Sequence, residues 1–129
     1  MAEPIDAERF IALFFDRFPL IAAGTDVCAR GVVHLEMHTF ARATQAAIRA
    51  EDTATVKTHF AFIGEVFRLA NPEVKNAVFV SYLECLSFDG RHGTKIKARQ
   101  LLTPQLQAGL RELEAYNAEL FKTARGRRG

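Results

Sequence analysis

The chain has 129 residues, of which 49% are hydrophobic and 25% charged, and its formal net charge is +2. This length fits one domain with a sizeable core, whereas no apolar run approaches the roughly 20 residues of a membrane-spanning helix. Acidic residues stand where a secretory signal would have its basic segment, so the sequence predicts a cytosolic protein.

The first predicted helix begins at Asp6, a residue suited to capping a helix, and ends before Pro19. Its apolar face recurs at helical spacing and consists of Phe10, Leu13, Phe14 and Phe18. Phe15 widens that face, which predicts packing against two neighbours. Residues 19–31 contain Gly24 and Gly31 and are predicted to form a loop.

Two longer helices follow. The first covers residues 32–50, with one apolar side made of Val33, Met37, Phe40, Ala41, Thr44, Ala47 and Ile48. The second is predicted to be capped by Thr53 and to end at Ala70. Its apolar residues recur every three or four positions, as Val56, Phe60, Ile63, Phe67 and Ala70, which is typical of a seam between helices. Pro72 then predicts a sharp turn into a helix hairpin.

The segment 72–88 is predicted to be the central buried helix around which the rest of the chain is organised. Asn71 is a good N-cap and Pro72 suits the first helical position. Beyond them, apolar residues occupy nearly every side of the helix, which is typical of a helix inside an assembly of others. Cys85 is expected to be a small core residue. Cys85 and Cys28, the second cysteine of the chain, are expected to be free thiols.

The C-terminal part begins with a predicted loop at residues 89–93 and a short helix at 95–102. Thr103 and Pro104 cap and open the last helix. Its predicted apolar stripe is Leu106, Leu110, Leu113, Leu120 and Phe121. No strand-like alternation is visible. The sequence therefore predicts an all-α domain at residues 1–124, with about five helices in stacked hairpins (a bundle or a short HEAT-like arch), and a flexible basic tail at 125–129.

Asn76, Ser81 and Glu84 are the candidate residues for binding a partner or ligand, because they are polar positions on the predicted central helix. Buried carboxylates are rare unless they are paired. One interpretation is a polar pocket or a contact point for a partner. The other is structural: Asn76 holds the backbone of a neighbouring helix, and Glu84 pairs with an arginine or caps a helix end.

His34 and His38 are four residues apart and share one face of a predicted helix, so they could supply two ligands to a metal ion. His59 is a candidate third ligand, along with several glutamates. Leu35 follows His34, which excludes the His-Glu-x-x-His pattern of metalloproteases. We expect two hydrogen-bonded histidines and no cofactor, and keep the metal site as the alternative.

The basic residues are concentrated near the C-terminus. From Arg91 onward there are nine basic and three acidic residues, and before it eight basic and twelve acidic ones. Such asymmetry can indicate a nucleic-acid partner. However, no aromatic residue stands between positions 89 and 115 to stack on bases, and no helix-turn-helix signature is present, so nucleic acid is not the favoured partner.

The stretch from Asn76 to Leu86 resembles the hallmark of an uncharacterised bacterial family of small helical proteins. Upstream features are similar in layout: His34 and Glu36 open a helix, and Phe60 and Ile63 precede the hallmark. The resemblance covers roughly residues 10–121 and implies stacked helix hairpins. Members are domains of unknown function, some of them similar to small partners encoded near bacterial toxins, and the family supplies no catalytic residues.

No complete catalytic set is recognisable, since the chain has neither a Gly-x-Ser-x-Gly nucleophile turn nor a glycine-rich phosphate loop. The sequence therefore favours a non-enzymatic protein-interaction module, with an immunity-type inhibitor of a toxin as its specific form. Its acidic bias before residue 90 could steer a basic partner. The alternative is a small metal- or ligand-binding protein that uses His34, His38 and Glu84. The sequence does not give the oligomeric state.

Overall fold

A computed structural model describes residues 3–86 and 98–126, without the side chains of Asn117 and of residues 121–126. Its helices confirm the predicted all-α class, and the described residues contain no strand beyond an isolated bridge between Ile5 and Ala70. Within these residues, no helix is both long and apolar enough to cross a membrane.

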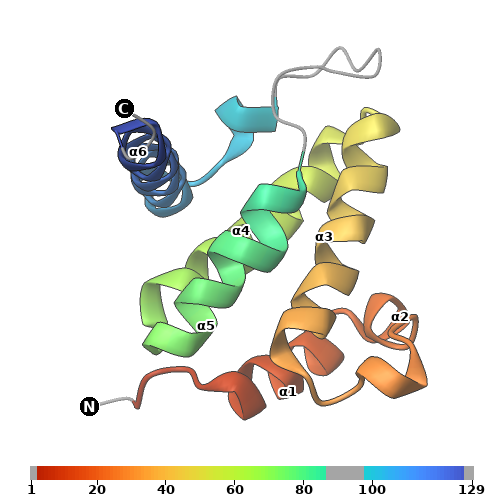
Figure 1. The fold of residues 1–129 in the computed structure, drawn as a ribbon. Coiled ribbons are helices and arrows are strands. Elements are labelled where there is room, and N and C mark those ends of the chain that lie inside the picture. The colour runs from red at the N-terminus through yellow and green to blue at the C-terminus, as the bar shows by residue number, and fades with distance from the viewer. Residues whose placement is uncertain (1–2, 87–97, 127–129) are drawn as a thin grey trace.

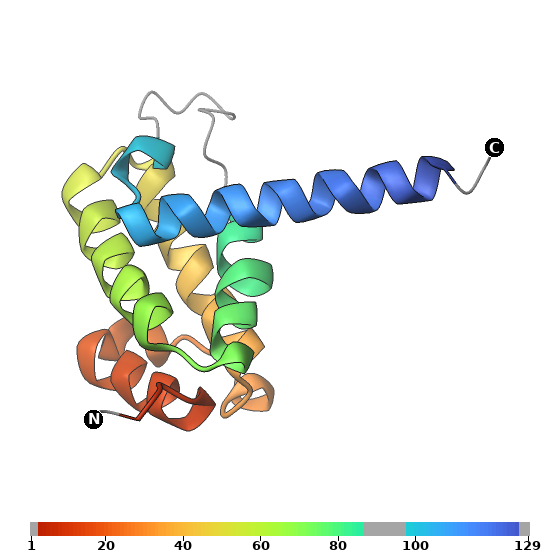
Figure 2. The ribbon, with the colours of Figure 1, turned by 90° about the vertical axis from the view of Figure 1, so that its left-hand side faces the viewer.

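The elements in chain order are α1 (Ala7–Arg17), α2 (Pro19–Ala22), η1 (Val27–Ala29), α3 (Val33–Arg49), α4 (Thr53–Leu69), α5 (Pro72–Ala77), η2 (Val78–Tyr82), η3 (Leu83–Cys85), η5 (Ala98–Leu101) and α6 (Pro104–Gly126). Helices α3 and α4 and the continuous α5–η2 segment lie beside one another, and α1 and α2 cover one end of this group (Figure 1). Helix α6 crosses the group and extends well beyond it (Figure 2).

Helix starts follow the predicted capping chemistry, with one shift. Asp6 accepts a hydrogen bond from the Arg9 N–H at 2.8 Å, and Asn71 accepts one from the Val74 N–H at 2.9 Å. Thr103 caps α6 in the same way. Helix α4 is capped by Asp52 and not by Thr53, because the Asp52 carboxylate accepts from both the backbone and the hydroxyl of Thr55.

The N-terminal segment differs from its prediction in two places. Phe15 is 38% exposed, so α1 buries a narrower face, centred on Phe10 and Phe14. Residues 19–31 are not only a loop: Pro19 opens the short helix α2, and a 3₁₀ turn, η1, follows. The segment before α1 is held in place because the Ile5 N–H donates to the Leu69 carbonyl and the Ile5 carbonyl accepts from Asn71.

The core matches the predicted faces of α3 and α4. All seven predicted residues of α3 are buried, as are four of the five in α4, where Phe67 is half-buried. The rings of Phe18, Phe40 and Phe62 pack edge-on or tilted with centroids 4.9–5.6 Å apart, which joins the α1–α2 junction to α3 and α4. His59 and Phe62, which the predicted seam of α4 did not include, are also buried.

The predicted helix at 72–88 is not regular and not buried all round. Helix α5 passes into a π-helical turn, η2, and then into a 3₁₀ turn, η3. Because the π-helical turn contains more residues per turn than an α-helix, the residues that face the core after it come about one position later in the sequence than in a regular helix. Leu83 and Leu86 are therefore buried, and Cys85 is exposed. Cys85 is therefore not a core residue, and Val80 is 46% exposed. Residues 87 and 88, the last two of the predicted helix, lie outside the described residues.

Two glycines allow close approach of the C-terminal part. A Cβ at Gly64 would lie 2.5 Å from the Thr103 hydroxyl, and a Cβ at Gly109 would lie 3.2 Å from the Phe67 ring. Both positions favour glycine, because a side chain there would push α6 away from α4. The first part of α6 is thereby seated on the body through Leu106 and Leu110, which are buried.

The remainder of α6 departs from the prediction. Leu113 is half-buried, Leu120 is 52% exposed, and the side chain of Phe121 lies outside the described ones. The helix runs to Gly126, so residues 125–126 of the predicted tail are helical, and 127–129 lie outside the described chain. The loop predicted at 89–93 and the start of the helix predicted at 95–102 also lie outside it; η5 corresponds to the end of the latter.

The inward and outward faces of the irregular segment give a stability prediction. We expect Val78→Asp to unfold the protein, because it places a carboxylate where the native side chain is fully buried. Val80→Asp, two residues away and half exposed, should shift the melting temperature by only a few degrees. Circular dichroism melts of the two variants check this, and similar melts would contradict the assignment of faces.

Candidate functional site

The irregular segment α5–η2–η3 presents polar groups on two opposite sides. Ser81 and Tyr82 point inward to α3 and α4, where both are buried. Asn76, Val80 and Glu84 are spaced four residues apart and lie on its exposed side. The inward side is a buried network of hydrogen bonds, and the outward side is one wall of a groove.

The buried network centres on the hydroxyl of Thr44. Its Oγ1 lies 2.8 Å from the Tyr82 hydroxyl, 2.9 Å from His59 Nδ1 and 3.1 Å from the Phe40 carbonyl oxygen. One arrangement satisfies every group: Thr44 donates to Phe40, while Tyr82 and the Nδ1–H of His59 both donate to Thr44. A single hydroxyl therefore connects α3, α4 and η2.

The surroundings of this network keep His59 neutral. Its ring lies among aromatic side chains, 4.7 Å from the Phe40 ring centroid and 5.3 Å from that of Phe18. Burial lowers the pKa of His59 from 6.5 to about 4, although Asp52 opposes the change. Burial also raises the pKa of Tyr82 well above its usual range, which keeps its hydroxyl available as a donor.

His34 joins the same segment at another point, with its Nδ1 2.8 Å from the Ser81 hydroxyl. Such a pair resembles a serine nucleophile with its base, but activation also needs a group that orients the imidazole, and no carboxylate is bonded to His34 among the described residues. Ser81 is, moreover, only 8% exposed. We interpret the contact as one that positions η2 against the start of α3.

The three candidate metal ligands do not come together. His38 is exposed, whereas His59 is buried beside Thr44. Thr44 is ten residues from His34 along α3, a rise of about 15 Å. Across residues 3–86 and 98–126, no group of three or more His, Cys, Asp or Glu side chains is arranged to hold a metal ion.

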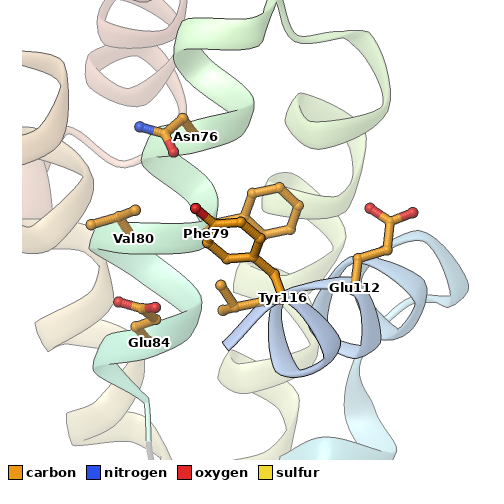
Figure 3. Close-up of a pocket in the computed structure, with 7 residues that line it drawn as sticks. Asn76, Phe79, Val80, Glu84, Glu112 and Tyr116 are labelled. Carbon is orange, nitrogen blue, oxygen red and sulfur yellow. The ribbon is translucent and has the colours of Figure 1, made fainter. Parts of the chain in front are cut away.

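The outward side of the segment faces α6 across a groove of about 360 Å³ (Figure 3). One wall carries Asn76, Val80 and Glu84, in that order, with Phe79 beside them. The other wall consists of Glu112, Leu113 and Tyr116 from α6. The Tyr116 and Phe79 side chains overlap at the centre of this view, and the carboxylates of Glu84 and Glu112 lie toward opposite ends.

This arrangement changes the interpretation of Asn76 and Glu84. Both are exposed, so they are not the buried groups that the structural interpretation assumed, and neither has a hydrogen-bond or ion-pair partner within the described residues. Ser81, the third candidate, belongs to the buried side. Glu112 and Tyr116 were missed, although Tyr116 follows Leu113 at helical spacing and could have been added to the predicted stripe.

A second unpredicted feature is Glu36, whose side chain is fully buried in the first part of α3. Neither of its carboxylate oxygens receives a hydrogen bond of good geometry. Burial raises the pKa of Glu36, while the backbone of Gly31 and the charge of Arg30 offset part of the effect. Glu36 is therefore a buried acid that contacts neither the groove nor the His59 network through any hydrogen bond.

A groove of about 450 Å³ lies between α1 and α4, where the Arg17 guanidinium is 6.0 Å from the Phe62 ring centroid. It contains none of the predicted site residues, and its one carboxylate, Glu65, is paired with Arg68 at 2.8 Å. The groove between η2 and α6 is the stronger candidate site, because its two carboxylates are unpaired within the described chain.

The chain belongs to the family of the domain of unknown function DUF7674, whose model matches residues 11–118. This confirms the resemblance to an uncharacterised family of small helical proteins. No curated protein and no solved structure shows a match to the chain. The match covers both walls of the groove up to its last residue, Tyr116.

The Thr44 network gives a prediction about coupling. Tyr82→Phe should lower the free energy of unfolding by about 1–2 kcal/mol, and Thr44→Val by about 2–3 kcal/mol, because the valine leaves both His59 and Tyr82 without a partner. The double variant should lower the free energy of unfolding by less than the sum of the two single effects. A double-mutant cycle by urea denaturation measures this, and strict additivity would contradict a shared network.

The low pKa of His59 predicts a loss of stability in mild acid. Between pH 6.5 and about 4 the unfolded chain binds a proton at His59 that the folded chain does not, so stability falls as the pH falls. By pH 5 the loss should be about 2 kcal/mol.

Glu36 acts in the opposite direction, because its raised pKa stabilises the folded state on acidification. The useful quantity is therefore the difference between wild type and His59→Gln, measured by urea denaturation from pH 7 to 5. The difference should shrink as the pH falls, and a constant difference would show that His59 titrates normally in the folded state.

Proposed function

We propose that this member of the DUF7674 family is a protein-interaction module that binds a basic segment with an apolar anchor in the groove between η2 and α6. The observation that carries the proposal is an apolar floor flanked by two carboxylates that have no partner among residues 3–86 and 98–126. Val80 and Tyr116 are 46% and 62% exposed, and Glu84 and Glu112 flank them.

The apolar floor supports binding because covering its exposed apolar side chains removes them from water, which is favourable. The exposed surfaces of Val80 and Tyr116 adjoin the half-buried rings and side chains of Phe79 and Leu113, so they form one patch and not scattered single residues. Tyrosine is also enriched at interface centres, since it offers a large, rigid contact area and a polar end. An apolar side chain of the partner would fill the space beside the Tyr116 ring.

The charges support a basic partner. Two carboxylates at opposite ends of a small apolar floor attract lysine or arginine residues on both sides of an anchor, and they repel acidic segments. Asn76 adds an amide that can hydrogen-bond to a partner's backbone. The buried Thr44 network supports the proposal indirectly, because it fixes the inward side of η2 and so leaves Val80 and Glu84 in a set orientation.

The specific form of this proposal is an immunity-type inhibitor that covers a basic toxin. It rests on the acidic rim of the groove, which would raise the association rate with a basic protein such as a nuclease. No catalytic step is part of the proposal, and the metal-binding alternative remains a separate hypothesis that elemental analysis of untagged protein can test.

Site-specific photocrosslinking tests the proposal. A benzoylphenylalanine residue at position 80 should crosslink to a defined protein segment in cells. The same residue at position 20, where the native Leu20 is 91% exposed on α2, should not. The crosslinked peptide, identified by mass spectrometry, should contain lysine or arginine near an apolar residue.

Binding of the synthetic peptide then provides the quantitative test. Glu84→Arg combined with Glu112→Arg should weaken its binding to the purified protein at least tenfold, and the affinity should fall as salt is added. Asp16→Arg, a charge reversal of the same kind at one exposed position of α1, serves as the control. Equal crosslinking from both positions, or binding that ignores the groove charges, would contradict the proposal.

A further inference from the structure

Two aromatic rings of the body lie next to a cation of the chain itself. The Arg17 guanidinium is 6.0 Å from the centroid of the Phe62 ring, and the Lys75 ammonium is 5.7 Å from that of Phe67. Such cations are attracted by the negative face of the ring. The Tyr116 ring differs: it is 62% exposed, and neither a cation nor another ring of the described chain contacts it.

We propose that Tyr116 and Glu112 form an arginine subsite, so that the basic residue which the groove selects beside the apolar anchor is arginine and not lysine. This inference rests on the proposed function, because it specifies the partner of the same groove. It requires a ring and a carboxylate that one guanidinium can reach together. It also requires that no cation of the described chain already occupies them.

Helix α6 places the two groups where one guanidinium reaches both. Glu112 and Tyr116 are one turn apart, which puts their Cβ atoms about 5–6 Å from each other on the same face of the helix. Both line the groove and project from the same side of α6 (Figure 3). Glu112 is exposed, so its side chain can turn toward a group that lies on the ring. A guanidinium stacked on Tyr116 can therefore donate to the Glu112 carboxylate.

The chemistry of this pair favours arginine over lysine. A guanidinium is planar and weakly hydrated, so it can stack on a ring and still donate two parallel hydrogen bonds to a carboxylate. An ammonium is a strongly hydrated point charge, and its pair with an exposed carboxylate contributes little. Glu112 attracts both cations in the same way through its charge. The contact with the Tyr116 ring therefore makes the difference, which we expect to be about tenfold in affinity.

The other end of the groove has no comparable pair. One turn before Glu84 stands Val80, an aliphatic residue without a π system. The Phe79 ring is half-buried and packs on Phe67, with the centroids 5.3 Å apart. Glu84 therefore supplies charge without a free ring face, and we expect it to accept lysine and arginine alike. The groove has one selective end and one general end.

Nearby basic residues of the described chain do not occupy the subsite. Arg99 is paired with Glu114 at 3.0 Å, and its hydrogen bond lowers the pKa of the Glu114 carboxyl. Arg99 and Arg111 line a separate pocket of about 200 Å³. Glu112 itself has no hydrogen-bond or ion-pair partner within the described residues. The carboxylate and the ring are thus available to an arginine of a partner.

Two synthetic peptides test the preference. Both are acetylated and amidated, one with the sequence Gly-Arg-Leu-Arg-Gly and the other with Gly-Lys-Leu-Lys-Gly, so they share their charge and their apolar anchor. Titration into the isotope-labelled full chain, followed by NMR, should shift backbone signals of both groove walls. We expect the dissociation constant of the arginine peptide to be about tenfold lower than that of the lysine peptide.

Matched variants locate the preference. Tyr116→Leu keeps an apolar side chain and removes the ring face, so the two dissociation constants should come within about twofold of each other. Phe15→Leu changes a ring of α1 that is 38% exposed and outside the groove, and it should keep the preference. Glu112→Gln should reduce the preference, whereas Glu84→Gln should weaken both peptides by a similar factor. Circular dichroism melts check that each variant is folded.

The outcomes separate this inference from the function on which it rests. Equal affinities of the two peptides for wild type would overturn the arginine subsite. If that binding still weakened on reversal of Glu84 and Glu112, the groove would remain a site for basic segments in general. A preference that survives Tyr116→Leu, or that Phe15→Leu also removes, would overturn the subsite as well.

An absence of binding also gives a result. If neither peptide shifts signals of the groove walls at several millimolar, the arginine subsite is overturned. The crosslinking experiment from position 80 then decides the proposed function independently, because it uses the natural partner and neither of these peptides.

Discussion

The hydroxyl of Thr44 is the contact on which the arrangement of the other helices depends. It meets His59 of α4, Tyr82 of η2 and the backbone of its own helix α3 within 3.1 Å. Hydrophobic packing alone tolerates small rotations of a helix, whereas a buried hydrogen bond has a fixed length and direction. The bond to Tyr82 therefore sets the rotation of η2 about its axis. That rotation determines which residues of the segment face α6.

The groove follows from that rotation and from the seating of α6. Gly109 lets α6 approach Phe67 and Phe79 closely, so the next two turns of α6 stand opposite Val80 and Glu84. Beyond them the helix leaves the body while its apolar stripe continues. Covering an apolar surface of this kind is favourable, and the acidic rim formed by Glu84 and Glu112 restricts what can cover it. The proposal of a basic partner starts from this surface.

Periodicity predicted the regular helices well, because the faces of α3 and α4 follow the 3.6-residue repeat along their whole length. The caps at Asp6, Asn71 and Thr103 were likewise visible, since each is a local interaction. The π-helical turn was not, because nothing in the run from Val78 to Tyr82 distinguishes it from a regular helix. For that reason Cys85 was expected inside and Glu84 among buried groups. The groove could not be predicted either, because its walls are far apart in the sequence: Glu84 and Glu112 are separated by 28 residues, and Val80 and Tyr116 by 36.

The π-helical turn holds one residue more than a regular helix needs over the same rise. Deleting a single residue there would restore the regular repeat and leave the following turns facing as they do now, because the bulge already absorbs the extra residue. Leu83 and Leu86 would stay in the core, and Cys85 would stay outside it. Closing the bulge without a deletion would instead turn everything after it by about 100° and bring Cys85 inward. The turn is thus a place where a relative of this chain can be one residue shorter and keep the same buried side chains.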